Sequence, residues 1–247
     1  LGGTDPRCGA SKHVSMSFPQ EAHVHRPVPE LRPTTWLATA PSNVDWRDVG
    51  GGLVGTAGGP GYSVEAAGRV LMERHIADGR LHVTVRPASA VTGSTATSLH
   101  DGLQLGSPDT APTGWLAAVS PLLEIDGHLA RFFADRPVYF PASVEQLLVL
   151  PAHADLTRAY LWSAMTWRNA GNPVTPLAMT LGDDRLTTFV PAEERADHAL
   201  HRDAVLLAAG HRGGESNYHG TGTPAPLVAA GAHADMHREM KSKPKGA

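Results

Sequence analysis

The first 62 residues restrict the possible folds of this chain more than any other segment. Residues 1–62 contain seven prolines and a cluster of seven glycines, and their apolar residues follow neither the two-residue period of a strand nor the 3.6-residue period of a helix. The same segment carries large apolar side chains such as Trp36 and Trp46, which disordered linkers seldom keep. We therefore predict an extended Pro/Gly-rich arm that becomes ordered by lying along another surface, either the body of this chain or a neighbouring subunit.

The rest of the chain divides into a predicted body and a short basic tail. Residues 63–240 mix helical and strand patterns without the regular alternation of a parallel α/β protein, so we expect an α+β fold of helices and short antiparallel strands. A Ser/Thr/Gly/Pro-rich stretch at 88–114 is predicted to be a long loop that could subdivide the body. The tail, residues 241–247, holds three of the four lysines of the chain.

Periodicity and capping residues predict the elements of the body. Ser63 can cap a helix that begins there, and Gly79 can end it. Residues 81–85 alternate between apolar and polar side chains, which predicts a strand. The remaining predictions are helical segments at 116–119 and 122–133 separated by Pro121, a strand at 138–140, helices at 143–150, 155–170 and 191–210, a hairpin of 177–181 with 186–190, a Gly-rich loop at 210–226 and an amphipathic helix at 227–240.

Composition argues against several classes of protein. The formal net charge of −3 argues against broad binding of nucleic acid by the body. Cys8 is the single cysteine, so the chain can form neither an internal disulfide nor a cysteine-based zinc cluster. No window of 18 apolar residues is present, and we therefore expect no membrane span. The chain begins with Leu1 rather than Met, which is expected of a processed or truncated protein.

The fourteen histidines give the main chemical lead. His198 and His201 are three residues apart on one predicted helix, and His233 and His237 are four apart on the last one, so each pair can lie on one side of its helix. Two imidazoles one turn apart can bind the same metal ion. These four histidines are the candidate zinc or manganese ligands of a His/Asp metal-dependent hydrolase, which is the alternative function that we consider.

The chain contains no motif that specifies a reaction. In the hydrolase alternative, Asp197 or Glu239 would orient a ligand or act as the base. However, the sequence has no HExxH zinc motif, no GxxxxGK[ST] phosphate loop and no GxSxG nucleophile elbow. Gly50, Gly52 and Gly55 match GxGxxG, but the residue pattern predicts no strand before them and no helix after them. We therefore interpret these glycines as a hinge or a close-packed crossing, and we expect no cofactor in the favoured interpretation.

Low charge, a long arm, extended loops and missing catalytic motifs favour a structural or assembly protein over an enzyme. We expect a subunit of a large symmetric particle, such as a viral capsid or a capsid-surface protein, located in a virion or a cytoplasmic assembly. Its partners would be other copies of itself or a second structural subunit. The basic tail could contact nucleic acid weakly or lie in solvent. The predicted contact residues are Trp36, Leu37, Trp46 and Leu53 of the arm and Lys241, Lys243 and Lys245 of the tail.

Overall fold

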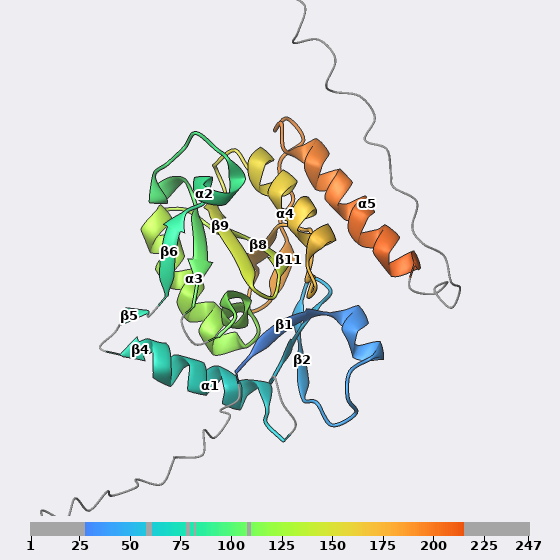
Figure 1. Cartoon of the computed structure of the whole chain (residues 1–247). Helices are drawn as coiled ribbons and strands as arrows, with labels where there is room; N and C mark the ends of the chain where they lie inside the picture. Colours follow the sequence, from blue (N-terminus) through green and yellow to red (C-terminus); the bar gives the residue numbers. More distant parts are fainter. Residues whose placement is uncertain (1–27, 58–60, 78–79, 82, 108–109, 215–247) are drawn as a thin grey trace, which may run out of the picture.

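The fold combines antiparallel sheets with helices, which confirms the predicted α+β class (Figure 1). The computed structural model describes residues 28–57, 61–77, 80–81, 83–107 and 110–214. The predicted helix at 227–240 and the tail at 241–247 lie outside these residues. The helices and 3₁₀-helices are η1 (Thr34–Ala38), α1 (Val64–His75), α2 (Ser89–Thr92), η2 (Leu99–Asp101), η3 (Pro112–Leu116), α3 (Val119–Phe133), α4 (Thr157–Asn169) and α5 (His198–Gly214). The strands are β1 (Glu30–Pro33), β2 (Trp46–Gly50), β3 (Leu53–Thr56), β4 (Ile76–Ala77), β5 (Arg80–Leu81), β6 (Thr84–Pro87), β7 (Leu103–Gly106), β8 (Pro137–Ser143), β9 (Gln146–Pro151), β10 (Met179–Leu181) and β11 (Leu186–Thr188).

The centre of the molecule is the hairpin of β8 and β9, in the middle of an antiparallel sheet with the order β11-β10-β8-β9-β7-β6. Successive side chains of a strand point to opposite faces of its sheet, and in this hairpin both sets are buried. One set joins the core beneath α1 and α3, and the other joins the core beneath α4 and α5. The first set is Tyr139, Leu147 and Val149, and the second is Val138, Phe140, Leu148 and Leu150.

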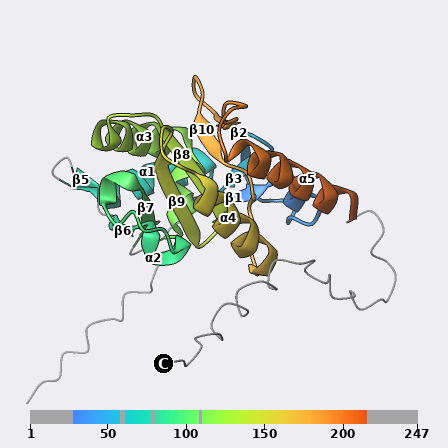
Figure 2. The same ribbon diagram turned by 90° about the horizontal axis from the view of Figure 1, so that it is seen from above.

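Helices cover both faces of this sheet (Figures 1 and 2). On one face α1 packs against α3, and on the other α4 lies against β8 with α5 beside it. The cap predicted for α1 is confirmed, since the N–H of Ala66 donates to Ser63 Oγ at 3.1 Å. Helix α3 continues through Pro121, contrary to the predicted interruption, because Pro121 lies in its first turn, where a missing N–H breaks no helical hydrogen bond.

Two further predictions within the body are wrong. Residues 146–151 form β9 rather than part of a helix, and the run Leu147–Leu150 is buried on both faces of the sheet. A short apolar run of this kind fits a central strand and a buried helix equally well, so the sequence did not distinguish them. The predicted loop at 88–114 contains β7, which pairs with both β6 and β9. Only Leu103 and Leu105 of this strand point inward, and two alternating apolar residues are too few to predict a strand.

Residues 30–56 of the predicted arm form a sheet with the order β1-β3-β2, so the prediction of an irregular segment is wrong there. These strands have only four or five residues each, which is too short for a clear period. Leu31, Val49 and Leu53 are buried in the same core as residues beneath α1 and α3. For this part of the arm, the surface that provides order is the body of its own chain.

Gly50 ends β2, Gly51 and Gly52 form the turn to β3, and this turn packs closely against the hairpin of β10 and β11. Gly50 and Gly51 have φ values of +93° and +61°, which residues with a side chain rarely adopt. A Cβ at Gly50 would overlap the carbonyl oxygen of Leu186, and one at Gly51 would overlap the side chain of Met179. The close-packed interpretation of the glycines is therefore confirmed. A strand does lead into the GxGxxG match, contrary to the prediction, but it is followed by a second strand and not by a helix.

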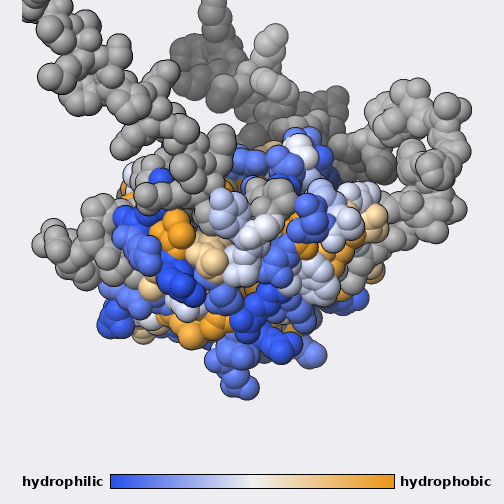
Figure 3. All heavy atoms as spheres, turned by 90° about the horizontal axis from the view of Figure 1, so that it is seen from below, coloured by the Kyte–Doolittle hydropathy of each residue, from blue (hydrophilic) through white to orange (hydrophobic). Residues whose placement is uncertain are grey.

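The strand predicted at 81–85 is wrong, because Leu81 belongs to β5 and residues from Thr84 onward belong to β6, which lies in a different sheet. The predicted hairpin corresponds to β10 and β11, and the predicted helix at 155–170 corresponds to α4. Helix α5 begins at His198 rather than at Pro191. None of the helices in the described ranges is long and apolar enough to cross a membrane. Seen from below the orientation of Figure 1, the surface of the described part is mainly hydrophilic, with separate hydrophobic patches (Figure 3).

The close contact of β3 with the body makes Gly55 a sensitive position. A Cβ at Gly55 would overlap the backbone carbonyl of Ala117, so we expect Gly55→Ala to lower the free energy of unfolding by about 2–4 kcal/mol. Gly171→Ala is the matched control, because a Cβ there meets no atom within 4 Å. Urea unfolding followed by circular dichroism measures both, and equal midpoints for the two variants would contradict the tight packing of β3.

Candidate functional site

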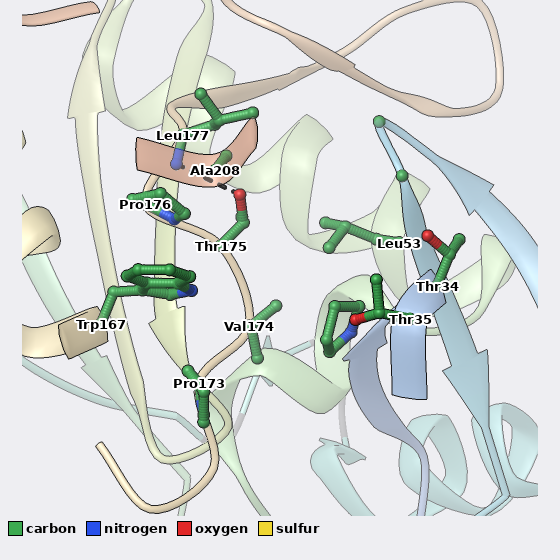
Figure 4. Close-up of a pocket in the computed structure, with 13 residues that line it drawn as sticks. Thr34, Thr35, Leu53, Trp167, Pro173, Val174, Thr175, Pro176, Leu177 and Ala208 are labelled. Atoms are coloured by element: carbon green, nitrogen blue, oxygen red, sulfur yellow. Dashed lines mark hydrogen bonds between the residues drawn. The ribbon is translucent and has the colours of Figure 1, made fainter. Parts of the chain in front are cut away.

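A cleft lies between the β1-β3-β2 sheet and the segment that joins α4 to β10 (Figure 4). One wall comes from the end of β1, the start of η1 and the β2–β3 turn. The other wall comes from the last turns of α4, from residues 173–177 and from α5. The lining residues are Pro33, Thr34, Thr35, Gly51, Gly52, Leu53, Trp167, Pro173, Val174, Thr175, Pro176, Leu177 and Ala208.

Backbone hydrogen bonds hold the first wall in place. The N–H of Thr34 donates to Gly52 O at 3.0 Å, which fixes the start of η1 to the β2–β3 turn. Gly51 is held against Met179 by the close approach described above. Figure 4 shows Thr34, Thr35 and Leu53 on this side of the cleft. The wall is therefore set before any ligand binds, which limits the entropy that binding would have to remove.

The second wall is tied to the central sheet. The N–H groups of Val174 and Thr175 donate to Ala142 O and Pro141 O of β8, at 3.1 and 3.2 Å. The Ser163 hydroxyl of α4 donates to Pro176 O at 3.2 Å. The Trp167 side chain projects from α4 and lies between Pro173 and Pro176, across the cleft from Thr34 and Thr35 (Figure 4). The aromatic platform of the cleft is thus rigid as well.

The chemistry of the cleft suits binding rather than catalysis. Among the described residues, the lining includes no Asp, Glu, His, Lys, Arg, Cys or Tyr, so this part of the chain places no side chain for general acid–base or metal chemistry in the cleft. Its cavity volume is about 70 Å³. Sites for small organic ligands usually enclose roughly 300–1,000 Å³. The cleft therefore has room for one or two apolar side chains, bordered by threonine hydroxyls.

The strongest polar cluster lies elsewhere, where the chain enters α5. The guanidinium of Arg195 contacts both oxygens of Asp197, with Nε–Oδ1 at 3.0 Å and Nη2–Oδ2 at 2.6 Å. Arg195 also donates to the carbonyls of Ala152, at 2.7 Å, and Ala154. The N–H of Leu156 donates to Asp197 Oδ2 at 3.2 Å. Asp197 is only 2% exposed, and its contacts join the start of α5 to the segment between β9 and α4.

His198 and His201 lie beside this cluster, with ring centroids 6.3 Å apart. His198 Nδ1 lies 3.0 Å from Pro191 O, and His201 Nδ1 lies 3.4 Å from the Tyr160 hydroxyl. Burial, and then the nearby His198, lower the pKa of His201 below its usual range. Each ring thus has a neighbour within the fold at its Nδ1 atom.

The four predicted metal ligands are not brought together in the described part of the chain. His198 and His201 are neighbours as predicted, while His233 and His237 lie outside the described residues. Within the described ranges, no group of three or more His, Cys, Asp or Glu residues could hold a metal ion. The four-histidine metal site therefore stays a prediction, because two of its four ligands lie outside the described residues.

The predicted contact residues have different environments. Leu53 is buried and lines the cleft, and Trp46 is 50% exposed. Trp36 and Leu37 are half-buried, and the Trp36 ring lies 5.7 Å from the Arg32 guanidinium. Lys241, Lys243 and Lys245 lie outside the described residues.

Sequence reasoning missed most of the cleft. Trp167 lies on the helix predicted at 155–170, and the spacing of Trp167, Pro173 and Pro176 gives no sign that they face Thr34 and Thr35 across a cleft. The signal that exists is compositional, a tryptophan followed closely by two prolines. Comparisons of this chain with protein-family models, with curated proteins and with solved structures found no match.

The buried ion pair predicts a large loss of stability on truncation. Arg195→Ala would leave the Asp197 carboxylate buried without its partner, so we expect the free energy of unfolding to fall by about 3–5 kcal/mol. Arg185→Ala is the control, because the Arg185–Asp48 pair is exposed and 3.6 Å apart, and its removal should cost less than about 1 kcal/mol. Chemical denaturation measures the free energy of unfolding of both variants. Similar losses of stability would show that the Arg195–Asp197 pair stabilises the fold no more than the exposed pair.

The lowered pKa of His201 predicts how stability depends on pH. Between about pH 7 and pH 5 the unfolded chain binds more protons at this residue than the folded chain, so stability should decrease as the pH falls. One such group contributes a slope of at most about 1.4 kcal/mol per pH unit. His201→Gln should flatten the slope in urea unfolding series at pH 5, 6, 7 and 8. Parallel profiles for wild type and variant would contradict this assignment.

Proposed function

We propose that this chain is a structural or assembly protein, a subunit that binds copies of itself or a second structural subunit, rather than an enzyme. The observation that supports this proposal is the chemistry of the cleft between the β1-β3-β2 sheet and Trp167. It is preformed, uncharged and sized for one or two apolar side chains. A partner chain can supply such side chains from an exposed turn or an extended segment.

The arm no longer supplies the main support for assembly. Residues 28–57 bury Leu31, Val49, Leu53 and Val54 within their own chain, so this part of the arm is ordered by its own body. The proposed contact is therefore the cleft, one wall of which is formed by residues 33–35 and 51–53 of the arm. A closed particle such as a viral capsid remains the kind of assembly that we propose.

Magnitudes indicate that the cleft is one part of a larger contact. Burying one Leu- or Phe-sized side chain is worth roughly 1.5–3 kcal/mol. Association of two proteins costs roughly 4–15 kcal/mol in lost freedom. The cleft alone therefore cannot hold a complex. It can select a partner and fix its position, while further surface supplies the remaining free energy.

The alternative of a His/Asp metal-dependent hydrolase gains no support from the described residues. His198 and His201 have neighbours within the fold, and Asp197 is saturated by Arg195 and a backbone N–H. Metal analysis of the purified full chain tests the alternative directly. Stoichiometric zinc or manganese that is lost on His198→Ala would favour the enzyme.

Filling the cleft should weaken assembly. Thr35→Phe places a ring in the cleft without removing a core residue, and we expect the association constant to fall about tenfold, since about 1.4 kcal/mol of burial is lost. Thr97→Phe is the control, because Thr97 is exposed and does not line the cleft. Sedimentation velocity of the full chain measures association against the 26.1 kDa of a single chain.

Two results would contradict the proposal. The first is a wild-type chain that remains at the mass of one copy at every concentration and with every structural partner offered. The second is equal association of the Thr35→Phe and Thr97→Phe variants with wild type, which would remove the cleft from the contact.

A further inference from the structure

Helix α5 carries the chain along the cleft and ends close to it. Ala208 of α5 lines the cleft together with Trp167 of α4. The described part of the chain ends at Gly214, which is six helical residues and therefore about 9 Å beyond Ala208. Residues 215–247 follow. This C-terminal segment therefore starts near the second wall of the cleft.

The segment is long enough to return to the cleft. From Gly214 to Pro224 an extended chain can span up to about 33–36 Å. This length is several times the distance back along α5 to Ala208, so it allows a turn and a crossing of the cleft. The part of the segment that follows Pro224 can therefore reach both walls of the cleft of its own chain.

The chemistry of the cleft selects one part of this segment. The described lining carries no charged side chain, and an unpaired charge buried there would cost free energy. Residues 216–232 contain no Asp, Glu, Lys or Arg, whereas residues 235–245 contain six of them. The sequence that suits the cleft therefore lies within 216–232.

Within this uncharged stretch, residues 223–227 have the sequence Thr-Pro-Ala-Pro-Leu. Pro224 and Pro226 are the only two prolines outside the described ranges that lie two positions apart. Proline fixes its own φ, and the residue before a proline is restricted to extended conformations. All four residues from Thr223 to Pro226 thus favour the polyproline II conformation, so their binding would remove little conformational entropy.

The cleft has the composition of sites that bind such segments. Grooves that recognise polyproline II segments are lined by aromatic side chains, against which proline rings pack. In this cleft the Trp167 ring lies on one side, and Thr34, Thr35 and Leu53 lie on the other (Figure 4). A polyproline II backbone makes no internal hydrogen bonds, so its carbonyls can accept from the threonine hydroxyls. A proline ring and Leu227 are the one or two apolar side chains for which the cleft has room.

Magnitudes favour a segment of the same chain over a separate ligand. Each apolar side chain buried in the cleft is worth roughly 1.5–3 kcal/mol, and a separate partner must also offset an association cost of roughly 4–15 kcal/mol. A segment joined to the cleft wall through a short linker avoids most of this cost, because it is held at an effective concentration in the mM range. A weak cleft is therefore sufficient for this segment.

We propose that residues 223–227 of the same chain occupy the cleft, with a proline ring packed against Trp167. The contact is autoinhibitory, because a structural partner can enter the cleft only after the segment has left it. This regulatory role rests on the proposed function. The contact itself does not, since it forms within a single chain.

Disulfide trapping in the full chain tests the contact. In a Cys8→Ser background, Thr35→Cys and Ala225→Cys place one thiol in the cleft wall and one in the segment. The matched control carries the same two thiols with Pro224→Ser and Pro226→Ser, which keeps the linker length and removes the proline rings. At low protein concentration with oxidised glutathione, we expect the disulfide within one chain to form at least about tenfold faster with the prolines than without them.

The outcomes of this experiment separate the inference from the proposed function. Equal rates with and without the prolines overturn the inference. A disulfide found only between two chains also overturns it, because the segment then binds a neighbouring copy. After either result, the proposed function still stands if Thr35→Phe weakens association. A proline-dependent disulfide within single chains supports the contact, and if the chain then associates with no partner, the proposed function alone fails.

Release of the segment should strengthen association. A partner can enter only those chains whose cleft is empty, so Pro224→Ser with Pro226→Ser should raise the association constant about threefold or more. Sedimentation velocity of the otherwise unchanged full chain measures this constant. An association constant equal to or below that of wild type overturns the autoinhibitory role.

Discussion

Burial of the β8–β9 hairpin on both faces is the constraint on which the rest of the structure depends. An antiparallel sheet can leave one face in water, but here Val138 and Phe140 need cover on one side and Tyr139 on the other. The chain therefore places α1 and α3 on one face and α4 and α5 on the opposite face. The β1-β3-β2 sheet then closes the side of the first core, and the cleft is what remains between that sheet and the second helical layer.

The position of α5 depends on a buried charge and not on apolar packing alone. Asp197 is held by Arg195 and by the N–H of Leu156, so the chain is fixed at the point where α5 starts. Removing the charges of Arg195 and Asp197 from water costs free energy. Their attraction and their hydrogen bonds to neighbouring backbone groups offset this cost. This anchor sets which side of α5 meets α4, and therefore sets the place of Ala208 in the cleft.

Local signals predicted the elements that local physics determines. The Ser63 cap, the turn at Gly182 and the length of α4 all depend on neighbouring residues, and the sequence was sufficient for them. Residues 146–151 were predicted to be helical because a short apolar run is equally compatible with a buried helix and a central strand. Residues 30–56 were predicted to be irregular because their order comes from contacts with residues more than 60 positions away, such as Ala117 against Gly55. The cleft could not be predicted, since its two walls are separated by more than 100 residues.

The seating of the Gly50–Gly51 turn against Leu186 and Met179 has a consequence for how the chain is made. The first strands leave the ribosome early, but their resting place is completed only when the β10–β11 hairpin emerges some 130 residues later. At roughly 5–20 residues per second, that interval lasts on the order of ten seconds. During this time Gly50 and Gly51 lack their native partners Leu186 and Met179, so the turn is uncovered in the nascent chain and is a site where chaperones can bind it.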